Sequence, residues 1–151
     1  TLVLDWRLVI PGPEKRQLFL WDAVFCMEKK TVVMSAMDHI MVWDLTTSQV
    51  KLDMPVPGIA KGFNTLCVSP DGRYVAAAEV LYAGAPGSDT IRVFDLEERT
   101  EILALTPHDN RATALSFSPD GKRLLAGYSD GTGEIWDIAI EKPAVDPDTN
   151  L

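Results

Sequence analysis

The side chains of this sequence that could do chemistry are concentrated in one short stretch near its end. His108 precedes Ser118 and, further on, the adjacent pair Ser129 and Asp130. A histidine, a carboxylate and a serine hydroxyl are the three groups that make a serine nucleophilic in acyl-transfer enzymes. The stretch therefore poses a choice between a catalytic triad and a structural hydrogen-bond network, and the elements around it decide that choice.

The other reactive groups have no spacing that favours catalysis or metal binding. Cys26 and Cys67 lie in strand-like segments without the paired spacing of a zinc site or a redox motif. We expect His39 in a solvated turn and Glu97-Glu98 in a solvated acidic loop. The sequence therefore predicts two buried free thiols, no metal site and no cofactor.

Charge and hydropathy argue against two classes of partner. The net charge is −8 and the pI is near 4.6, and the basic residues form no cluster larger than a pair such as Lys29-Lys30. Proteins that bind nucleic acid usually display a basic patch. No apolar run approaches the ~18 residues of a membrane-spanning helix, and no charged-then-apolar signal pattern opens the sequence. We expect no nucleic-acid or membrane binding, and a reducing, cytoplasmic location.

The stretch around the candidate triad predicts three short strands. Residues 112–117 alternate in side-chain character, as a half-buried strand does, and residues 118–121 read Ser-Pro-Asp-Gly, which suits a tight turn. Residues 124–128 give a second apolar strand, and residues 129–132 give a second turn. A third strand over residues 134–137 ends in a Trp-Asp pair. We therefore expect an antiparallel meander.

The same pattern occurs earlier in the chain. Residues 69–72 repeat the Ser-Pro-Asp-Gly turn, and the third strand after it ends in Phe94-Asp95. Trp43-Asp44 ends a similar strand in a more degraded repeat. Trp43 to Phe94 is 51 positions and Phe94 to Trp136 is 42. The chain is therefore built from an internal repeat.

These turns, aromatic-Asp pairs and intervals resemble those of the WD40-repeat family, whose period is about 40–45 residues. The resemblance implies an all-β fold of β-propeller blades, each with four antiparallel strands, in an incomplete ring. The expected units are 1–10, the third and fourth strands of a partial blade; 18–57, a degenerate blade; 58–107, a blade with a loop insertion near 80–89; 108–140, a blade; and 141–151, an extended tail. Trp21-Asp22 falls in a first strand, so we interpret it as a packed aromatic beside a chance aspartate.

The resemblance also implies a structural role for the candidate triad. The family often holds a blade together with a buried network of Asp, His, Ser or Thr, and Trp, and the corresponding residues here are His108, Asp130 and Trp136. A histidine can link a carboxylate to a hydroxyl, which satisfies groups that would each cost ~1–3 kcal/mol if buried alone. We therefore expect a structural network and no catalytic residue.

One loop is the candidate partner-binding site. Gly72 to Asp95 spans 23 positions whereas Gly121 to Asp137 spans 16, so seven residues are inserted between the second and third strands of that blade. In the family such loops stand above one face of the propeller, and exposed apolar residues on a loop favour binding. The alternative is that Leu81 and Tyr82 extend the strand and pack on a neighbouring blade. The candidate residues are Leu81, Tyr82, Ala83, Ala85 and Pro86.

The family resemblance implies a non-catalytic scaffold that binds a protein or peptide partner. The alternative is a propeller domain or subunit of a larger enzyme, such as a cofactor-dependent dehydrogenase, that positions a partner or cofactor. That alternative needs His, Cys or carboxylate residues clustered on the central-channel loops, and the sequence shows no such cluster. Propellers usually have 4–8 blades. About three and a half repeats therefore predict a fragment or partial ring, whose open edges favour self-association.

Overall fold

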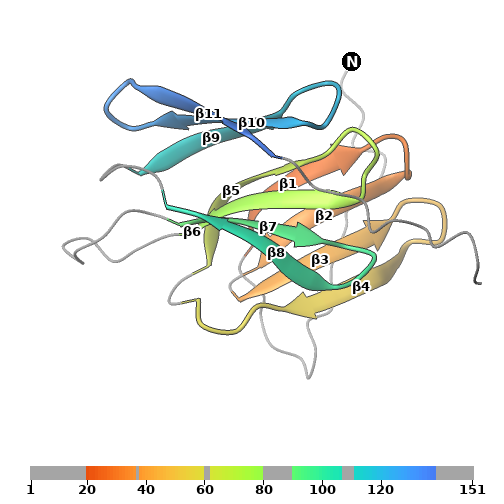
Figure 1. Ribbon diagram of the computed structural model, residues 1–151. Coiled ribbons are helices and arrows are strands. Elements are labelled where there is room, and N and C mark those ends of the chain that lie inside the picture. Colours follow the sequence, from red (N-terminus) through yellow and green to blue (C-terminus); the bar gives the residue numbers. More distant parts are fainter. Residues whose placement is uncertain (1–19, 37, 60–61, 80–89, 107–110, 139–151) are drawn as a thin grey trace, which may run out of the picture.

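The computed structural model describes residues 20–36, 38–59, 62–79, 90–106 and 111–138 (Figure 1). The expected partial blade at 1–10 and the tail at 141–151 lie outside these ranges. The described residues form strands and turns, and within them no helix is long and apolar enough to cross a membrane. The strands are β1 (Leu20–Cys26), β2 (Thr31–Ala36), β3 (His39–Asp44), β4 (Gln49–Pro55), β5 (Phe63–Val68), β6 (Tyr74–Glu79), β7 (Ile91–Asp95), β8 (Thr100–Leu105), β9 (Ala112–Phe117), β10 (Arg123–Tyr128) and β11 (Gly133–Asp137).

The strands form three antiparallel sheets in chain order. β1 to β4 make the first sheet, β5 to β8 the second, and β9 to β11 the third. Every strand pairs with its neighbour in sequence, so each sheet is a simple meander. The first strands of the three sheets lie next to one another, β5 between β1 and β9 (Figure 1). The fold is therefore all-β, as expected, and the described sheets do not close a ring. The limits of the individual blades stay predictions.

The Ser-Pro-Asp-Gly turns are built by their own side chains. The Ser69 hydroxyl donates to Asp71 Oδ1 at 2.6 Å and accepts from the Tyr74 N–H at 2.8 Å. Gly72 has a φ of 69°, in the left-handed region that glycine adopts without strain. The turn at Ser118 repeats the same hydroxyl-to-carboxylate hydrogen bond at 2.6 Å. The motif residues recognised in the sequence are therefore those that form the hairpins.

The first two sheets bury a continuous apolar core between them. Phe63 on β5 and Phe94 on β7 meet edge to face, with ring centroids 5.9 Å apart and an interplanar angle of 77°. Phe94 takes the place that tryptophan holds in the other repeats and is 2% exposed. The buried members of this core are Val33, Ile40, Val42, Leu52, Met54, Val56, Phe63, Leu66, Val75, Ala77 and Phe94.

A second core joins the second sheet to the third. It includes small residues of β6, and β5 and β6 both contact β9 across the two sheets. Trp136 on β11 is partly buried against this core. The buried members are Cys67, Tyr74, Ala76, Ala78, Ile91, Val93, Ala112, Leu124, Ala126, Tyr128 and Ile138. Each sheet thus packs on the next through a largely apolar interface, which makes the described structure a stack of blades.

The interpretation of Trp21-Asp22 is wrong on both counts. Trp21 is 48% exposed and is not a packed aromatic. Asp22 Oδ2 accepts a hydrogen bond of 2.9 Å from the Leu66 N–H of β5. A bulge between Leu20 and Asp22 shifts the register of β1 at this point. The bulge turns Asp22 toward the second sheet, so this aspartate ties the first two sheets together.

Candidate functional site

The expected network of His108, Asp130 and Trp136 is only partly in view. His108 lies outside the described residues. Asp130 stands in the β10–β11 turn, where its Oδ1 accepts from the Thr132 N–H at 2.9 Å and from the Thr132 hydroxyl at 2.7 Å. Trp136 pairs with Leu124 across β10 and β11. The network therefore stays a prediction, and the candidate loop of Leu81, Tyr82, Ala83, Ala85 and Pro86 also lies outside the described residues.

One serine of the candidate triad has a local spacing typical of hydrolases. Residues 127–131 read Gly-Tyr-Ser-Asp-Gly, which matches the G-x-S-x-G pattern. In a hydrolase that pattern forms a strained turn between a strand and a helix. Here Ser129 sits in the hairpin turn between the antiparallel strands β10 and β11, with its N–H bonded to the Arg111 carbonyl at 3.0 Å. The pattern therefore builds a β-turn and not a nucleophile elbow.

The described residues do not gather metal ligands. Within the described ranges, no group of three or more His, Cys, Asp or Glu side chains is placed to hold a metal ion. Cys26 and Cys67 are free and buried, as expected. Burial raises the pKa of the Cys67 thiol to about 12. Because the thiolate is the reactive form, Cys67 is an inert packing residue.

His39 is placed differently from the solvated turn residue that the sequence predicted. It begins β3 and pairs with Pro55 of β4. Its Nδ1 lies 2.6 Å from Asp53 Oδ1, and its Nε2 lies 3.6 Å from Asp38 Oδ1. The side chain is 23% exposed. His39 thus joins the last two strands of the first sheet, because Asp53 on β4, which pairs with Met41, lies diagonally across the ladder within reach of the imidazole.

The aspartate that ends the third strand of a repeat fixes the turn that follows. Asp95 Oδ1 accepts from the N–H groups of Glu97 and Glu98 at 2.8 and 3.0 Å. Asp44 Oδ1 accepts in the same way from the two residues after Leu45, at 2.7 and 2.9 Å. The Thr47 N–H is the largest cause that lowers the pKa of Asp44 below its ordinary value. Both carboxylates therefore stay ionised at neutral pH and hold the β3–β4 and β7–β8 turns in one shape.

Asp95 also carries a partly buried ion pair. Arg73 Nη2 and Nε lie 2.7 and 2.9 Å from Asp95 Oδ2. Burial by itself raises the pKa of Asp95, but the Arg73 hydrogen bond and the turn N–H groups outweigh it and lower that pKa. Arg123 and Asp137 repeat the contact in the third sheet at 2.8 Å, on exposed side chains. The pair therefore recurs between repeats and is part of the scaffold.

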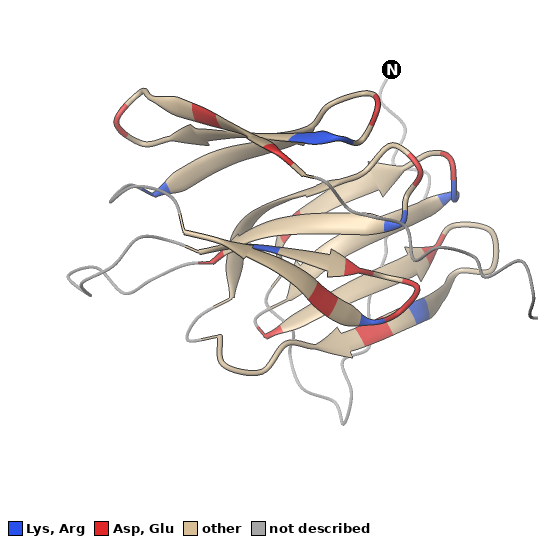
Figure 2. Ribbon diagram, in the orientation of Figure 1, with Lys and Arg blue, Asp and Glu red and all other residues tan. Residues whose placement is uncertain are grey.

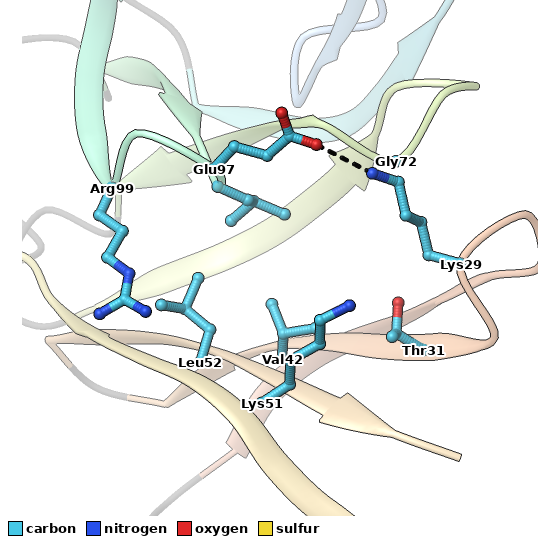
Figure 3. Close-up of a pocket in the computed structure, with 9 residues that line it drawn as sticks. Lys29, Thr31, Val42, Lys51, Leu52, Gly72, Glu97 and Arg99 are labelled. Atoms are coloured by element: carbon cyan, nitrogen blue, oxygen red, sulfur yellow. Dashed lines mark hydrogen bonds and ion pairs between the residues drawn. The ribbon is translucent and has the colours of Figure 1, made fainter. Parts of the chain in front are cut away.

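A cleft of about 350 Å³ opens between the first and second sheets at the end where these turns lie (Figure 3). Its walls come from the β1–β2 turn, from β4 and from the β7–β8 turn. Gly72 allows the close approach here, since a Cβ at that position would lie 2.6 Å from Cys26 Sγ and 2.7 Å from Lys29 Cγ. The lining residues are Lys29, Thr31, Val42, Lys51, Leu52, Gly72, Leu96, Glu97 and Arg99.

Three cations and one carboxylate line this cleft. Lys29 Nζ pairs with Glu97 Oε1 at 3.0 Å across its mouth (Figure 3). Within the described ranges, Lys51 and Arg99 form no ion pair. Figure 2 shows basic positions on strands and turns of the first two sheets, while acidic residues mark turns of all three sheets. The cleft is therefore locally cationic on a chain whose net charge is −8.

No local pattern in the sequence indicates this cleft, because its cations stand far apart along the chain. Lys29, Lys51 and Arg99 belong to three different hairpins. Only the packing of the first sheet on the second brings them to one opening.

The comparisons with known proteins agree with this architecture. The family model described as "WD domain, G-beta repeat" matches residues 99–137, which cover β8 to β11. The solved structure of RRP9 WD40 repeats superimposes with a TM-score of 0.68 at 19% identity, over 82% of this chain and 37% of that one. Meandering four-stranded sheets packed face to face define the β-propeller class.

Curated relatives point to the same family. The chain is 35% identical to target of rapamycin complex subunit wat1 of Schizosaccharomyces pombe over 77 residues, 50% of this chain and 22% of the relative. It is 29% identical to small ribosomal subunit protein RACK1y of Oryza sativa over 106 residues, 66% of this chain and 28% of the relative. It is 26% identical to the LST8 homolog of Drosophila melanogaster over 140 residues, 87% of this chain and 43% of the relative. The chain thus spans less than half the length of these relatives, and it belongs to the WD40-repeat family.

Proposed function

We propose that this chain is part of a non-catalytic WD40 scaffold that binds a protein or peptide partner. The proposal rests on the hydrogen bonds that engage its serine and aspartate side chains. Ser69, Asp71 and Asp95 are each engaged in hydrogen bonds that build turns. The same positions in a third repeat, Ser118 and Asp120, are engaged in the same way. Groups held by the backbone in repeated turns serve the fold and are not set up for a reaction.

The relatives support the same proposal through their printed names. One is a subunit of the target of rapamycin complex and another is a small ribosomal subunit protein. Both names describe members of larger assemblies. We propose that this chain also works inside an assembly, in the cytoplasm, where its two free thiols stay reduced.

The candidate contact surface is the loop inserted in the second repeat. It carries Leu81, Tyr82, Ala83, Ala85 and Pro86. We propose that these apolar residues contact the partner, since exposed apolar loop residues on a rigid scaffold are typical of recognition sites.

The test compares the intact protein with a variant in which residues 81–87 are replaced by a two-residue turn. Both are tagged, expressed in the source cells and purified, and the partner recovered per mole of bait is measured by quantitative mass spectrometry. We expect a partner at near-stoichiometric yield with the intact protein and its loss from the variant, at an unchanged thermal midpoint. A midpoint lowered by several degrees would show that the loop packs on a neighbouring blade. The absence of any stoichiometric partner would contradict the scaffold itself.

Self-association is a second proposal, based on the outer face of the third sheet. Leu125 and Ile135 are directly paired on β10 and β11 and are 47% and 66% exposed. Side by side they form an apolar strip on the face opposite the second core. Light scattering of the isolated chain tests the proposal. We expect dimers or larger species that Leu125→Lys disperses, whereas a monomer with sharp cooperative unfolding would contradict it.

A further inference from the structure

We propose that the cleft between β4 and the β7–β8 turn binds an extended acidic peptide segment of the partner. An anionic side chain of that segment lies between Lys51 and Arg99, and an adjacent aliphatic side chain lies on Leu52 and Leu96. The inference rests on the proposed scaffold function, because it assigns a second contact surface and its chemistry to the same protein.

The charge of the cleft selects an anion. Glu97 is already engaged by Lys29 at 3.0 Å, and Arg73 Nε approaches its other oxygen at 3.8 Å. Lys51 and Arg99 remain without an ion pair among the described residues. Asp44 acts electrostatically on Lys51, but its Oδ1 is taken by two turn N–H groups. Lys51 and Arg99 can therefore each pair with an anion that enters the cleft. The net negative charge of the chain disfavours anion binding elsewhere on its surface.

The apolar residues that line the cleft favour an aliphatic side chain next to the anionic one in the bound peptide. Val42 and Leu52 are buried members of the core between the first two sheets, and both also line the cleft. Leu96 is partly buried against the same core. In Figure 3, Leu52 lies between Arg99 and the overlapping side chains of Val42 and Lys51, so apolar side chains stand beside both cations at the opening.

A second cavity of about 200 Å³ lies next to the cleft and shares Arg99 with it as a lining residue. Its walls are largely apolar and come from the end of β4 and from Phe94. The one carboxylate there, Glu101, pairs with Arg92 at 2.9 Å. Arg99 therefore stands between two hollows, where it can contact a segment that crosses both.

The cations are held in place by the turns described above. Arg99 has a φ of 58°, a left-handed conformation that a non-glycine residue rarely adopts. The Asp95 carboxylate holds this turn through the N–H groups of Glu97 and Glu98. Lys51 extends from β4, just after the turn that Asp44 holds. The turns therefore fix the backbone positions of both cations before an anion binds, and only their side chains have to be ordered on binding.

The experiment measures peptide binding to the intact protein by fluorescence anisotropy. The probe is a fluorescein-labelled ten-residue peptide that alternates aspartate and leucine, with matched peptides in which asparagine or phosphoserine replaces every aspartate. The protein variants are the double substitution Lys51→Gln with Arg99→Gln and the control Lys122→Gln, an exposed cation in the β9–β10 turn. Thermal midpoints of all variants confirm that each is folded.

We expect the aspartate peptide to bind the intact protein and the Lys122→Gln control equally, and to bind the double variant at least ten-fold more weakly. The asparagine peptide should bind at least ten-fold more weakly than the aspartate peptide. Tighter binding of the phosphoserine peptide that the double variant abolishes would identify a phosphorylated segment as the source of the anion. Equal affinity for the intact protein and the double variant would overturn the inference, as would equal capture of a single-stranded DNA of the same charge.

The outcome is separable from that of the scaffold proposal. If the double variant recovers the cellular partner at full yield and binds the acidic peptide no more weakly, this cleft is not a contact surface while the scaffold stands. If the intact protein recovers no partner at all, the scaffold proposal fails first.

Discussion

Replacing Phe94 by alanine tests whether the first two sheets pack as adjacent blades. The side chain is 2% exposed, meets Phe63 edge to face, and lies in the core that both sheets share. Truncating a buried phenylalanine costs about 3–5 kcal/mol. Loss of the aromatic pair is part of that cost and amounts to about 0.5–1.5 kcal/mol. With a urea m-value of about 2 kcal/mol/M, the unfolding midpoint should fall by about 2 M.

The assay is urea unfolding followed by circular dichroism, with two matched variants. Phe94→Leu keeps most of the volume and should cost only about 1–2 kcal/mol. Phe25→Ala removes the same ring from a position that is 67% exposed on β1 and should change stability by less than about 0.5 kcal/mol. A midpoint for Phe94→Ala equal to that for Phe25→Ala would refute the packing of the two sheets.

Three further predictions concern polar contacts. Asp22→Ala removes the acceptor of the Leu66 N–H on β5 and should lower the free energy of unfolding by about 1–3 kcal/mol in the same urea assay. Asp22→Asn should have an intermediate effect. Because the pKa of Asp95 is lowered in the folded protein, its stabilisation is complete above the unfolded pKa of about 3.9 and is lost as pH falls through the folded value. Urea midpoints at pH 5 and pH 3 should therefore differ less in Asp95→Asn, and an equal acid loss would contradict the Arg73 pair. His108→Ala should cost about 1–3 kcal/mol if the predicted network forms, and His39→Ala should also destabilise, by less, since it loses the contact with Asp53. Two variants as stable as the intact protein would contradict both.

The strands and turns were predictable because their signals are local. The Ser-Pro-Asp-Gly turns use hydroxyl and carboxylate contacts within five residues, and the aromatic-Asp endings hold the turns that immediately follow them. A repeated local pattern is sufficient to set an antiparallel meander, so the all-β fold followed from the sequence.

The contacts between sheets were not predictable in the same way. The role of Asp22 is not visible in a local pattern, because its partner, Leu66, is 44 positions away and a bulge is needed to turn the aspartate toward it. The contact of His39 with Asp53 depends on the β3–β4 register, which places Asp53 opposite Met41 and diagonal to His39. Register and bulges depend on the whole sheet, which a local pattern does not specify.

The cleft was missed for a related reason. Lys51 and Arg99 are ordinary exposed cations in the sequence, and a solvated basic side chain is the usual interpretation. Their meeting depends on how the first sheet packs against the second, and on the turns that Asp44 and Asp95 hold. Sites between repeats arise from packing, whereas the repeat itself arises from local pattern.

The central claim, that this chain binds a partner through rigid WD40 blades, is tested most directly by amide hydrogen exchange of the intact protein with and without its co-purified partner. We expect slow exchange in the central strands β2, β3, β6 and β7 in both states, because these strands are paired on both sides. We expect partner-dependent protection only in the inserted loop and in the turns that line the cleft. Protection nowhere in residues 20–138, or partner-induced ordering of the central strands, would contradict it.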